Sequence, residues 1–439
     1  MRARSIKKRS VKVVTLGCSK NLVDSELLMG QLQSNAFVVA QDENENSETV
    51  IINTCGFIES AKQESIDTIL QYLEVKNNGG IEKLYVTGCL SQRYGAELKN
   101  EISGVDGWFG TRDLPQLLKT LKADYKKELV GERLLTTPRH FAYLKIAEGC
   151  DRPCSFCAIP LMRGQHLSVP IEDLVTQTQA LAGKGVKELI LIAQDLTFYG
   201  LDLYKRRSLA DLLDKLSQVK RIEWIRLHYA FPGGFPLEVL DAMNRHENIC
   251  KYLDMPLQHI SDAVLKRMKR GITKEKTLEL IEKIREKVPN IALRTTLMTG
   301  FPGETLKEHE EMLHWIEETK FDRLGVFTYS AENGTTAFSL TDDVLDKEKK
   351  RRADAVMELQ RTISLTNNEI KIGKTFKTLI DREEGGLWVG RTEFDSPDVD
   401  NEVWISPPFS MDCKPGEFVQ VKVNSATEFD LCGSIIHTV

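Results

Sequence analysis

The sequence lacks any long apolar run. Among its 439 residues, no stretch approaches the ~20 consecutive apolar residues that a membrane-spanning helix needs. The basic start (residues 1–14) is not followed by an apolar segment, which argues against a secretory signal. The chain also lacks a strong charge of either sign, because 59 Lys and Arg face 64 Asp and Glu for a formal charge of −5. We therefore expect a cytoplasmic protein with no membrane partner.

Histidine is scarce, with only eight residues, and nine cysteines in a chain of cytosolic character do not indicate disulfides. Cys250, Cys413 and Cys432 stand alone and are expected to be small buried apolar residues. The other six cysteines fall into two sets of three, which points to metal or redox chemistry. These sets are Cys18, Cys55 and Cys89, and Cys150, Cys154 and Cys157.

The first set of cysteines follows a repeated pattern. Three short β-branched runs, 11–18, 49–55 and 83–89, each end in a cysteine, and helical patterns separate them. This alternation predicts a parallel sheet with helices, in which all strands open on one edge at their carboxyl ends. We therefore expect the three thiols to meet at that edge. The alternative is that they are three unrelated core thiols.

A second series of six strand patterns with intervening helices follows: 143–150, 188–195, 224–230, 252–259, 292–300 and 323–330. Six such units are too few to close an eight-fold barrel, so the pattern predicts a partial, TIM-like (β/α)6 barrel with its site at the carboxyl ends. A long polar helix begins near Asp342. Beyond it, short strands broken by turn residues predict a small antiparallel β-barrel.

The predicted fold is therefore a multidomain α/β protein with three parts. Residues 1–130 form a parallel α/β domain, 131–372 the partial barrel, and 373–439 the small β-barrel.

The second set of cysteines is too small for structural zinc, which takes four closed ligands. Thiolates also hold iron–sulfur clusters, and three of them on a four-iron cluster leave one iron open to bind a small molecule. Phe156, inside this set, could pack over a planar base, although a lone aromatic is more often part of a core.

The spacing Cys-x-x-x-Cys-x-x-Cys after the first strand of a partial barrel resembles the signature of the radical S-adenosylmethionine (SAM) enzymes. An upstream domain with three strand-end cysteines and a downstream barrel resembling a TRAM domain are similar to the methylthiotransferases of that superfamily. Four stretches resemble the class that modifies an aspartate of small-subunit ribosomal protein S-twelve: "TLGCSKNLVDSE", "INTCGFI", "GCDRPCSFCAIPLMRG" and "YLDMPLQHIS". The class that modifies isopentenyl-adenosine in tRNA typically has Gln-Met-Asn after the first cysteine.

The resemblance implies two [4Fe–4S] clusters and SAM as cofactors. The cluster on Cys150, Cys154 and Cys157 would bind SAM and cleave it reductively to methionine and a 5′-deoxyadenosyl radical. The cluster on Cys18, Cys55 and Cys89 would hold the sulfur to be transferred, and no catalytic side chain is implied beyond the cluster ligands. The candidate SAM contacts, each of which could instead support a neighbouring contact, are Phe156, Gln194, Asp195, Gln258, Arg294, Thr296 and Gly300.

The charge of the C-terminal barrel bears on the substrate. Residues 374–439 carry six Lys and Arg against twelve Asp and Glu. A nucleic-acid-binding module should be basic, so we expect the acidic barrel to dock a basic ribosomal protein and not tRNA. The alternatives are an acidic surface without a docking role, a tRNA methylthiotransferase, and a non-enzymatic iron–sulfur protein. A flavodoxin or ferredoxin is the expected kind of electron donor.

Asp24 and Glu26 could be mistaken for a catalytic carboxylate pair. They lie near the start of the first predicted helix. We therefore expect them to cap that helix and to interact with its dipole.

Overall fold

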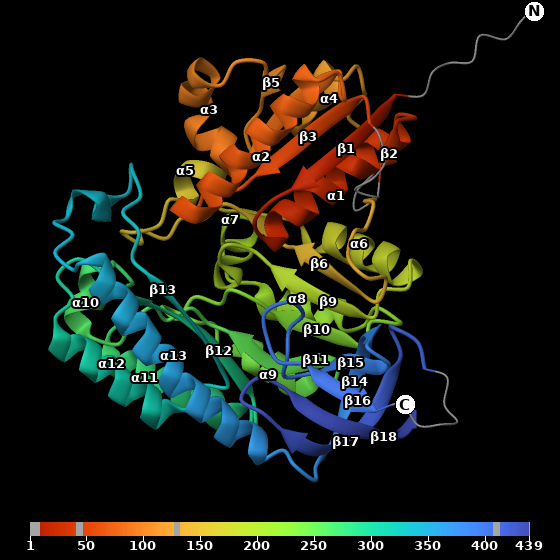
Figure 1. Ribbon diagram of the computed structural model, residues 1–439. Coiled ribbons are helices and arrows are strands. Elements are labelled where there is room, and N and C mark those ends of the chain that lie inside the picture. Colours follow the sequence, from red (N-terminus) through yellow and green to blue (C-terminus); the bar gives the residue numbers. More distant parts are fainter. Residues whose placement is uncertain (1–8, 41–46, 127–131, 407–412, 439) are drawn as a thin grey trace, which may run out of the picture. The chain divides into compact units, whose positions relative to one another are not determined.

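The computed structural model describes residues 9–40, 47–126, 132–406 and 413–438 (Figure 1). The chain divides into two compact units. Unit 1 comprises Met1–Thr136, Ala147–Asp151 and Ala158–Ala180, and unit 2 comprises Thr137–Ile146, Arg152–Cys157 and Leu181–Val439. Most of the basic start, residues 1–8, lies outside the described residues. The division into domains at residues 130 and 372 stays a prediction.

Unit 1 contains a five-stranded parallel sheet in the order β2-β1-β3-β4-β5. The chain moves outward from β1 to β2 and then returns to the other side of β1 to form β3. Crossovers between parallel strands are right-handed, so this reversal places helices on both faces of the sheet. The strands are β1 (Ser10–Thr15), β2 (Val38–Ala40), β3 (Thr49–Thr54), β4 (Lys83–Gly88) and β5 (Gly107–Trp108).

Two apolar layers hold the helices of unit 1 on the sheet. On one face, Leu28 and Leu32 of α1 and Leu117 of α4 pack in a cluster with Ile51 of β3. On the other face, helices α2 and α3 pack against the neighbouring strand residues, Val50 and Ile52 among them. This alternation along β3 is the period of two that a strand buried on both faces requires. The helices are α1 (Ser19–Ser34), α2 (Glu59–Asn77), α3 (Cys89–Glu101) and α4 (Leu114–Thr120).

Unit 1 also includes a short antiparallel ribbon and a short helix. The ribbon pairs β7 (Ala147–Glu148) with β8 (Leu167–Ser168). Between them, α5 (Ile159–Arg163) packs its Ile159 and Met162 against Cys89. Helix α6 (Ile171–Gly183) begins in this unit.

Unit 2 contains a six-stranded parallel sheet in the order β13-β12-β11-β10-β9-β6. Its strands follow one another in sequence order, so right-handed crossovers put every connecting helix on the same face, as in a barrel. The predicted partial (β/α)6 barrel is therefore confirmed. The strands are β6 (Phe141–Lys145), β9 (Glu188–Ile192), β10 (Trp224–Leu227), β11 (Ile249–Asp254), β12 (Ala292–Thr299) and β13 (Arg323–Thr328).

The helices of unit 2 connect these strands, and α13 leads on to the C-terminal barrel. Among the described residues, none is long and apolar enough to cross a bilayer. The helices of unit 2 are α7 (Leu201–Tyr204), α8 (Leu209–Leu216), α9 (Glu238–Arg245), α10 (Asp262–Arg267), α11 (Lys274–Lys287), α12 (Leu306–Thr319) and α13 (Asp346–Glu369).

The C-terminal part of unit 2 is a closed barrel in the order β14-β15-β16-β18-β17. The predicted antiparallel pairing is wrong for one pair, because β16 and β18 run parallel. Strand direction cannot alternate all the way around a ring with an odd number of strands, so one neighbouring pair must be parallel. The strands are β14 (Thr375–Glu384), β15 (Leu387–Thr392), β16 (Val403–Ser406), β17 (Phe418–Ala426) and β18 (Leu431–Thr438).

A buried ionic contact joins the barrel to the six-stranded sheet within unit 2. Glu188 of β9 accepts hydrogen bonds from Arg226 of β10 and from Arg391 of β15, each at 2.8 Å. Asp395, in the loop after β15, pairs with Arg323 of β13. Several of the barrel's charged side chains therefore face the sheet and not the solvent.

Candidate metal centre

The carboxyl edge of the unit 1 sheet carries the first cysteine set. Cys18 follows β1 and is the N-cap residue of α1, Cys55 follows β3, and Cys89 is the first residue of α3 after β4. The cysteines therefore end three neighbouring strands, and β1 and β3 flank the point where the strand order reverses. Ligands of open parallel sheets bind at that point. The structure thus places the three residues on one edge, as the sequence predicts.

Two buried asparagines tie the cysteine loops together. The Nδ2 of Asn21 on α1 donates to the carbonyl oxygens of Leu16 at 2.7 Å and Thr54 at 3.0 Å. The Nδ2 of Asn53 donates to the carbonyl oxygen of Asn21 at 2.9 Å. The Sγ of Cys89 lies 3.8 Å from the Oδ1 of Asn21. Asn21 therefore joins all three loops, a role that sequence reasoning missed.

Glycines beside the cysteines allow these loops to approach at backbone distance. A Cβ on Gly17, whose φ is +89°, would lie 2.7 Å from the Cβ of Cys55 and 2.9 Å from its Sγ. A Cβ on Gly56 would lie 2.8 Å from the backbone of Leu90. Side chains at these positions would push the thiols apart, so each glycine is required by a close approach.

The electrostatics of this edge indicate that the three thiols are near one another. Burial raises the pKa of the Cys89 thiol to about 12, and it also raises the pKa of Cys55. Cys18 raises both pKa values further by repulsion between thiolates, whereas Arg163 lowers both. Buried thiols of this kind stay protonated until a cation replaces the proton, which is how thiolate–metal sites form.

Arg163 is a buried residue of this site that sequence reasoning did not identify. Its Nη1 lies 2.6 Å from the Oδ2 of Asp24 and 3.1 Å from the Oε2 of Glu148. The prediction that Asp24 and Glu26 cap α1 is wrong. Asp24 binds Arg163, and Glu26 accepts hydrogen bonds from Thr136 and pairs with Arg133. Both carboxylates lie beyond the first turn of α1, where the helix dipole has little effect.

Within unit 1, Cys150 lies on a tightly built turn after β7. Its backbone N–H donates to the carbonyl oxygen of Gly164 at 3.0 Å. Gly149 has a φ of +76°, and a Cβ there would lie 2.0 Å from the carbonyl oxygen of Gln165. The backbone that precedes Cys150 can therefore follow this path only with glycine.

In unit 2, Ser155 fixes the loop that carries Cys154 and Cys157. The Ser155 backbone N–H donates to the carbonyl oxygen of Met268 at 3.0 Å, and its Oγ donates to that of Arg267 at 2.8 Å. The Nη1 of Arg270 donates to the Sγ of Cys154 at 3.3 Å. This anchored loop presents two soft thiols, and one of them, Cys154, lies beside a buried cation.

Phe156 packs in the core of unit 2. Its ring lies 6.4 Å from that of Phe301 in an edge-to-face arrangement, within an apolar cluster that also contains Tyr329. It is half-buried. The sequence left two roles open for Phe156, core packing and contact with a cofactor. The structure shows the core packing.

Gln194 and Asp195 lie directly after β9, at the carboxyl edge. The Asp195 carboxylate accepts hydrogen bonds from the backbone N–H of Thr197 at 2.8 Å and from the Nε of Arg152 at 2.7 Å. The Arg152 guanidinium lies 4.0 Å from the ring of Phe198. Asp195 therefore orients Arg152 on the cysteine loop.

The remaining predicted contacts lie on or near β11 and β12. Arg294, Thr296 and Met298 are half-buried and alternate with buried residues, so they share one face of β12. Arg294 is paired with Asp254 at 2.9 Å and with Asp400 of the barrel at 3.3 Å. Two carboxylates therefore already hold this side chain.

Gln258 and Gly300 have φ values of 74° and 70°. The Gln258 backbone N–H donates to the carbonyl oxygen of Thr296 at 2.9 Å, which places Gln258 beside the end of β12. A Cβ on Gly300 would lie 2.2 Å from the Cγ of Lys349, so packing against α13 requires this glycine. The assignment of these residues to SAM stays a prediction.

The donor chemistry of both cysteine sets fits iron–sulfur clusters. None of the nine described cysteines forms a disulfide. Within the described ranges, no three His, Cys, Asp or Glu side chains are arranged to hold a single metal ion. In a [4Fe–4S] cluster each thiolate binds a different iron, so a trio of thiols need not converge on one point.

Comparisons with known proteins agree with this architecture. Residues 144–316 match the family model "Radical SAM superfamily", residues 10–110 match "Uncharacterized protein family UPF0004", and residues 372–436 match "TRAM domain". The structure of the radical SAM methyltransferase TsrM from Kitasatospora setae has a similar fold, with a TM-score of 0.53 and 15% identity. That similarity covers 93% of this chain and 84% of TsrM. Fold and cysteine pattern together define this chain as a radical SAM enzyme.

The sequence relatives narrow the class. The "Ribosomal protein uS12 methylthiotransferase RimO" of Cytophaga hutchinsonii is 58% identical over 437 residues, which covers 99% of this chain and 100% of that protein. The proteins of the same name from Porphyromonas gingivalis and Phocaeicola vulgatus are 52% and 49% identical, and each comparison covers 98% of this chain and 100% of the relative. The chain belongs to the family of ribosomal protein uS12 methylthiotransferases.

Proposed function

We infer that this chain transfers a methylthio group to the β-carbon of an aspartate in uS12, the S-twelve protein of the small ribosomal subunit. The observation that carries this inference is 58% identity over nearly the whole chain to a uS12 methylthiotransferase. Both cysteine sets, the partial barrel and the terminal barrel lie within that matched length. A cytoplasmic location, where ribosomal proteins are made, is part of this proposal.

The two cysteine sets hold the two [4Fe–4S] clusters in this proposal. Cys150, Cys154 and Cys157 are assigned to the cluster that binds SAM, on the basis of their spacing. Cys18, Cys55 and Cys89 are assigned to the auxiliary cluster, and their positions at three neighbouring strand ends support this. Reductive cleavage of SAM supplies the radical chemistry that an unactivated C–H bond demands, and the auxiliary cluster supplies a place for the sulfur.

The chain's own residues shape the space for SAM. Gln194 and Gln258 follow β9 and β11 at their carboxyl ends, where ligands of a partial barrel bind, and Thr296 lies in the second half of β12. We assign direct SAM contacts to these three. Phe156, Asp195, Arg294 and Gly300 are assigned to the walls of the site, since packing, hydrogen bonds or ion pairs already engage them.

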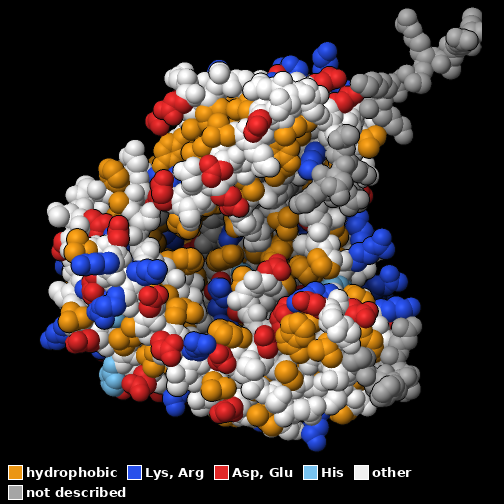
Figure 2. Space-filling model, in the orientation of Figure 1, with side chains coloured by type: hydrophobic (Ala, Val, Ile, Leu, Met, Phe, Trp, Pro, Cys, Tyr) orange, Lys and Arg blue, Asp and Glu red, His pale blue; other side chains and the backbone are white. Residues whose placement is uncertain are grey.

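We further propose that the C-terminal barrel docks uS12, a basic protein. Of its twelve acidic residues, Asp381, Glu393, Asp395 and Asp400 contact groups on the sheet side of unit 2. The remaining described residues from 374 to 438 include seven acidic and six basic side chains, and one of the basic ones, Arg391, pairs with Glu188 of the sheet. On the face shown in Figure 2, acidic, basic and apolar side chains lie side by side over the barrel. The net charge of the barrel alone therefore does not explain docking. Docking also needs a local site on the barrel that combines acidic and apolar side chains.

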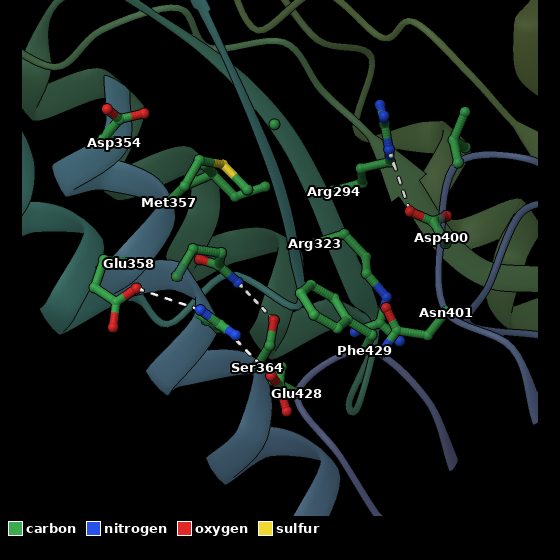
Figure 3. A pocket seen from close by; sticks show the side chains of 15 residues that line it. Arg294, Arg323, Asp354, Met357, Glu358, Ser364, Asp400, Asn401, Glu428 and Phe429 are labelled. Carbon is green, nitrogen blue, oxygen red and sulfur yellow. Dashed lines mark hydrogen bonds and ion pairs between the residues drawn. The ribbon is translucent and has the colours of Figure 1, made fainter. Parts of the chain in front are cut away.

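A pocket of about 510 Å³ provides such a feature. It lies between α13, β12, β13 and two barrel loops (Figure 3). Three apolar side chains on its lining are exposed: Met357 by 41%, Val399 by 51% and Phe429 by 56%. Glu428, on the same lining, lies 3.2 Å from the Nε of Arg361. The whole lining carries four carboxylates, those of Asp354, Glu358, Asp400 and Glu428, against three arginines, Arg294, Arg323 and Arg361. An apolar anchor beside this small acidic excess suits a basic segment of uS12.

The activity test uses protein reconstituted with iron and sulfide without oxygen, SAM and a low-potential reductant, with purified uS12 in one reaction and tRNA in a parallel one. We expect one aspartate of uS12 to gain a methylthio group, detected by mass spectrometry, together with release of 5′-deoxyadenosine. A ferredoxin or flavodoxin is the proposed natural reductant. Methylthio-adenosine in tRNA with unmodified uS12 would contradict the assignment in favour of a tRNA enzyme. Absence of 5′-deoxyadenosine would favour a non-enzymatic iron–sulfur protein.

The docking test compares two charge reversals within the barrel. Glu428→Lys changes a pocket residue, and Glu383→Lys is the matched control because Glu383 is exposed and does not line the pocket. We expect Glu428→Lys to raise the KM for uS12 about tenfold and Glu383→Lys to change it less than twofold. Equal effects would mean that only the overall charge of the barrel matters.

A further inference from the structure

Arg270, just beyond the end of α10, is a buried cation with an unusual set of contacts. It is 5% exposed. Its Nη1 donates to the Sγ of Cys154 at 3.3 Å, and its Nη2 donates to the carbonyl oxygen of Pro256 at 2.5 Å. Its guanidinium carbon lies 4.2 Å from the centre of the Phe231 ring. Three elements of unit 2 therefore hold this side chain in place.

The other buried arginines of the described chain each pair with a carboxylate. They are Arg133, Arg163, Arg226, Arg323, Arg352 and Arg391. Within the described ranges, Arg270 forms no such pair. Among the contacts named above, the Cys154 thiol is the one that can carry a negative charge. Arginine stays protonated in proteins, and a buried charge without a counter-charge is strongly destabilising. The positive charge of Arg270 is therefore directed at Cys154.

Arg163, beside the first cysteine set, provides an instructive contrast. Arg163 lowers the pKa of the Cys89 thiol, but Asp24 and Glu148 already neutralise the Arg163 guanidinium. Its positive charge is therefore shared with two carboxylates, whereas that of Arg270 is directed to one cysteine. The cation beside the first cysteine set is thus neutralised by carboxylates, whereas the cation beside Cys154 is not.

We propose that Arg270 is the electrostatic partner of the cluster assigned to Cys150, Cys154 and Cys157, and that it raises the reduction potential of that cluster. This inference rests on the proposed function, which assigns a cluster to these cysteines. Reduction by the low-potential donor adds one electron, and hence one negative charge, at the cluster. A nearby cation and an N–H···S hydrogen bond stabilise the more negative state more than the oxidised one.

The neighbours of Arg270 fix its geometry. Its backbone N–H donates to the carbonyl oxygen of Leu265 at 3.0 Å, which holds the end of α10. Phe231 also contacts Arg152, whose guanidinium lies 3.9 Å from the ring, and Asp195 binds that arginine. Arg270 is thus a positioning residue with a defined orientation, and a shorter side chain would not reach both Cys154 and Pro256.

The experiment measures the potential directly. The full chain with Cys18, Cys55 and Cys89 replaced by Ala is reconstituted with iron and sulfide, so that one cluster contributes to the signal. Redox titration followed by electron paramagnetic resonance gives the midpoint potential for Arg270→Gln, Arg270→Lys and the parent. Arg267→Gln is the matched control, because Arg267 is the last residue of α10 and its side chain contacts Gly303 and Glu308.

We expect Arg270→Gln to lower the ratio of reduced to oxidised cluster about tenfold at a fixed potential, which corresponds to a shift of about 59 mV for one electron. Arg270→Lys retains the charge and should shift the ratio less than Arg270→Gln, and Arg267→Gln should not shift it. An unchanged potential in iron-loaded Arg270→Gln would overturn the proposal. If Arg270→Gln keeps its fold but loses iron, retention of iron by Arg270→Lys supports the proposal, and equal loss in both overturns it.

This readout separates the inference from the proposed function. If the parent protein binds no cluster at these cysteines, the proposed function fails. If the parent binds the cluster and modifies uS12, an unchanged potential in Arg270→Gln removes only the role of Arg270.

Discussion

Arg391 of β15 and Glu188 of β9 form a buried ion pair, with 2.8 Å between Nη2 and Oε2 and side-chain exposures of 2% and 0%. The two residues are 203 positions apart in the sequence. Attraction to Arg391 and Arg226 outweighs the effect of burial and lowers the pKa of Glu188. This carboxylate therefore stays charged in the core and links the barrel to the six-stranded sheet.

The first prediction concerns this pair. Glu188→Gln leaves two buried arginines short of a counter-charge, so we expect a loss of about 3–5 kcal/mol in the free energy of unfolding. Urea denaturation at pH 7 measures it. Asp211→Asn, which breaks the exposed pair of Arg206 and Asp211, is the control and should cost at most about 1 kcal/mol. Equal losses of unfolding free energy in the two variants would mean that the buried pair stabilises the fold no more than the exposed pair does.

The second prediction concerns acid stability. Burial favours the protonated form of Asp381, but attraction to Arg391 and a hydrogen bond with His140 lower its pKa from 3.8 to about 2. A carboxyl whose pKa is lower in the folded state stabilises the fold above its ordinary pKa, and this contribution is lost as the pH falls through the folded value. The difference in stability between the parent and Asp381→Asn should therefore be largest above about pH 4 and shrink towards pH 2. Urea midpoints measured across this range test it; a constant difference would rule out the linkage.

The third prediction concerns Gly17. Gly17→Ala places a Cβ 2.7 Å from that of Cys55, so we expect the first cysteine set to lose most of its iron after reconstitution. Gly79→Ala is the matched control, because its φ of +77° is equally left-handed but no atom lies within 4 Å of the added Cβ. Iron and sulfide per chain are measured for both. If Gly17→Ala bound as much iron as Gly79→Ala, the close approach of Gly17 to Cys55 would not be required for the site.

The fourth prediction tests the two-cluster assignment. Replacement of Cys18, Cys55 and Cys89 by Ala should halve the iron bound per chain, and so should replacement of Cys150, Cys154 and Cys157. The first variant should still cleave SAM, whereas the second should not, because only the second set is assigned to SAM. Replacement of the isolated Cys250, which is buried in an apolar cluster, is the control and should leave the iron content unchanged. Full iron in either triple variant would refute the division into two sites.

Local sequence signals predicted much of this fold. The run 49–55 predicts a strand that the structure has as Thr49–Thr54, and the run 83–89 corresponds to Lys83–Gly88. Alternating β-branched residues and helical periodicity are properties of neighbouring residues, so the sequence reports them directly. The position of each cysteine at a strand end follows from the same signals, because the carboxyl ends of parallel strands share one edge.

The interactions of charged residues were not predictable in this way. Asp24 is 139 residues from its partner Arg163, and Glu26 is 110 residues from Thr136. The sequence suggested a role in the nearby helix because no local signal marks a distant partner. Arg270 was missed for the same reason, since its contact with Cys154 spans 116 residues.

The sequence by itself determined the order of helices and strands, the two sets of three cysteines and the family to which the chain belongs. The tertiary structure alone decided which charges are neutralised. Asp395 and Asp400 count towards an acidic barrel in the sequence, but they face arginines of the sheet in the fold. Composition sums charges regardless of position, whereas burial and pairing depend on which distant side chains the fold brings within a few ångströms.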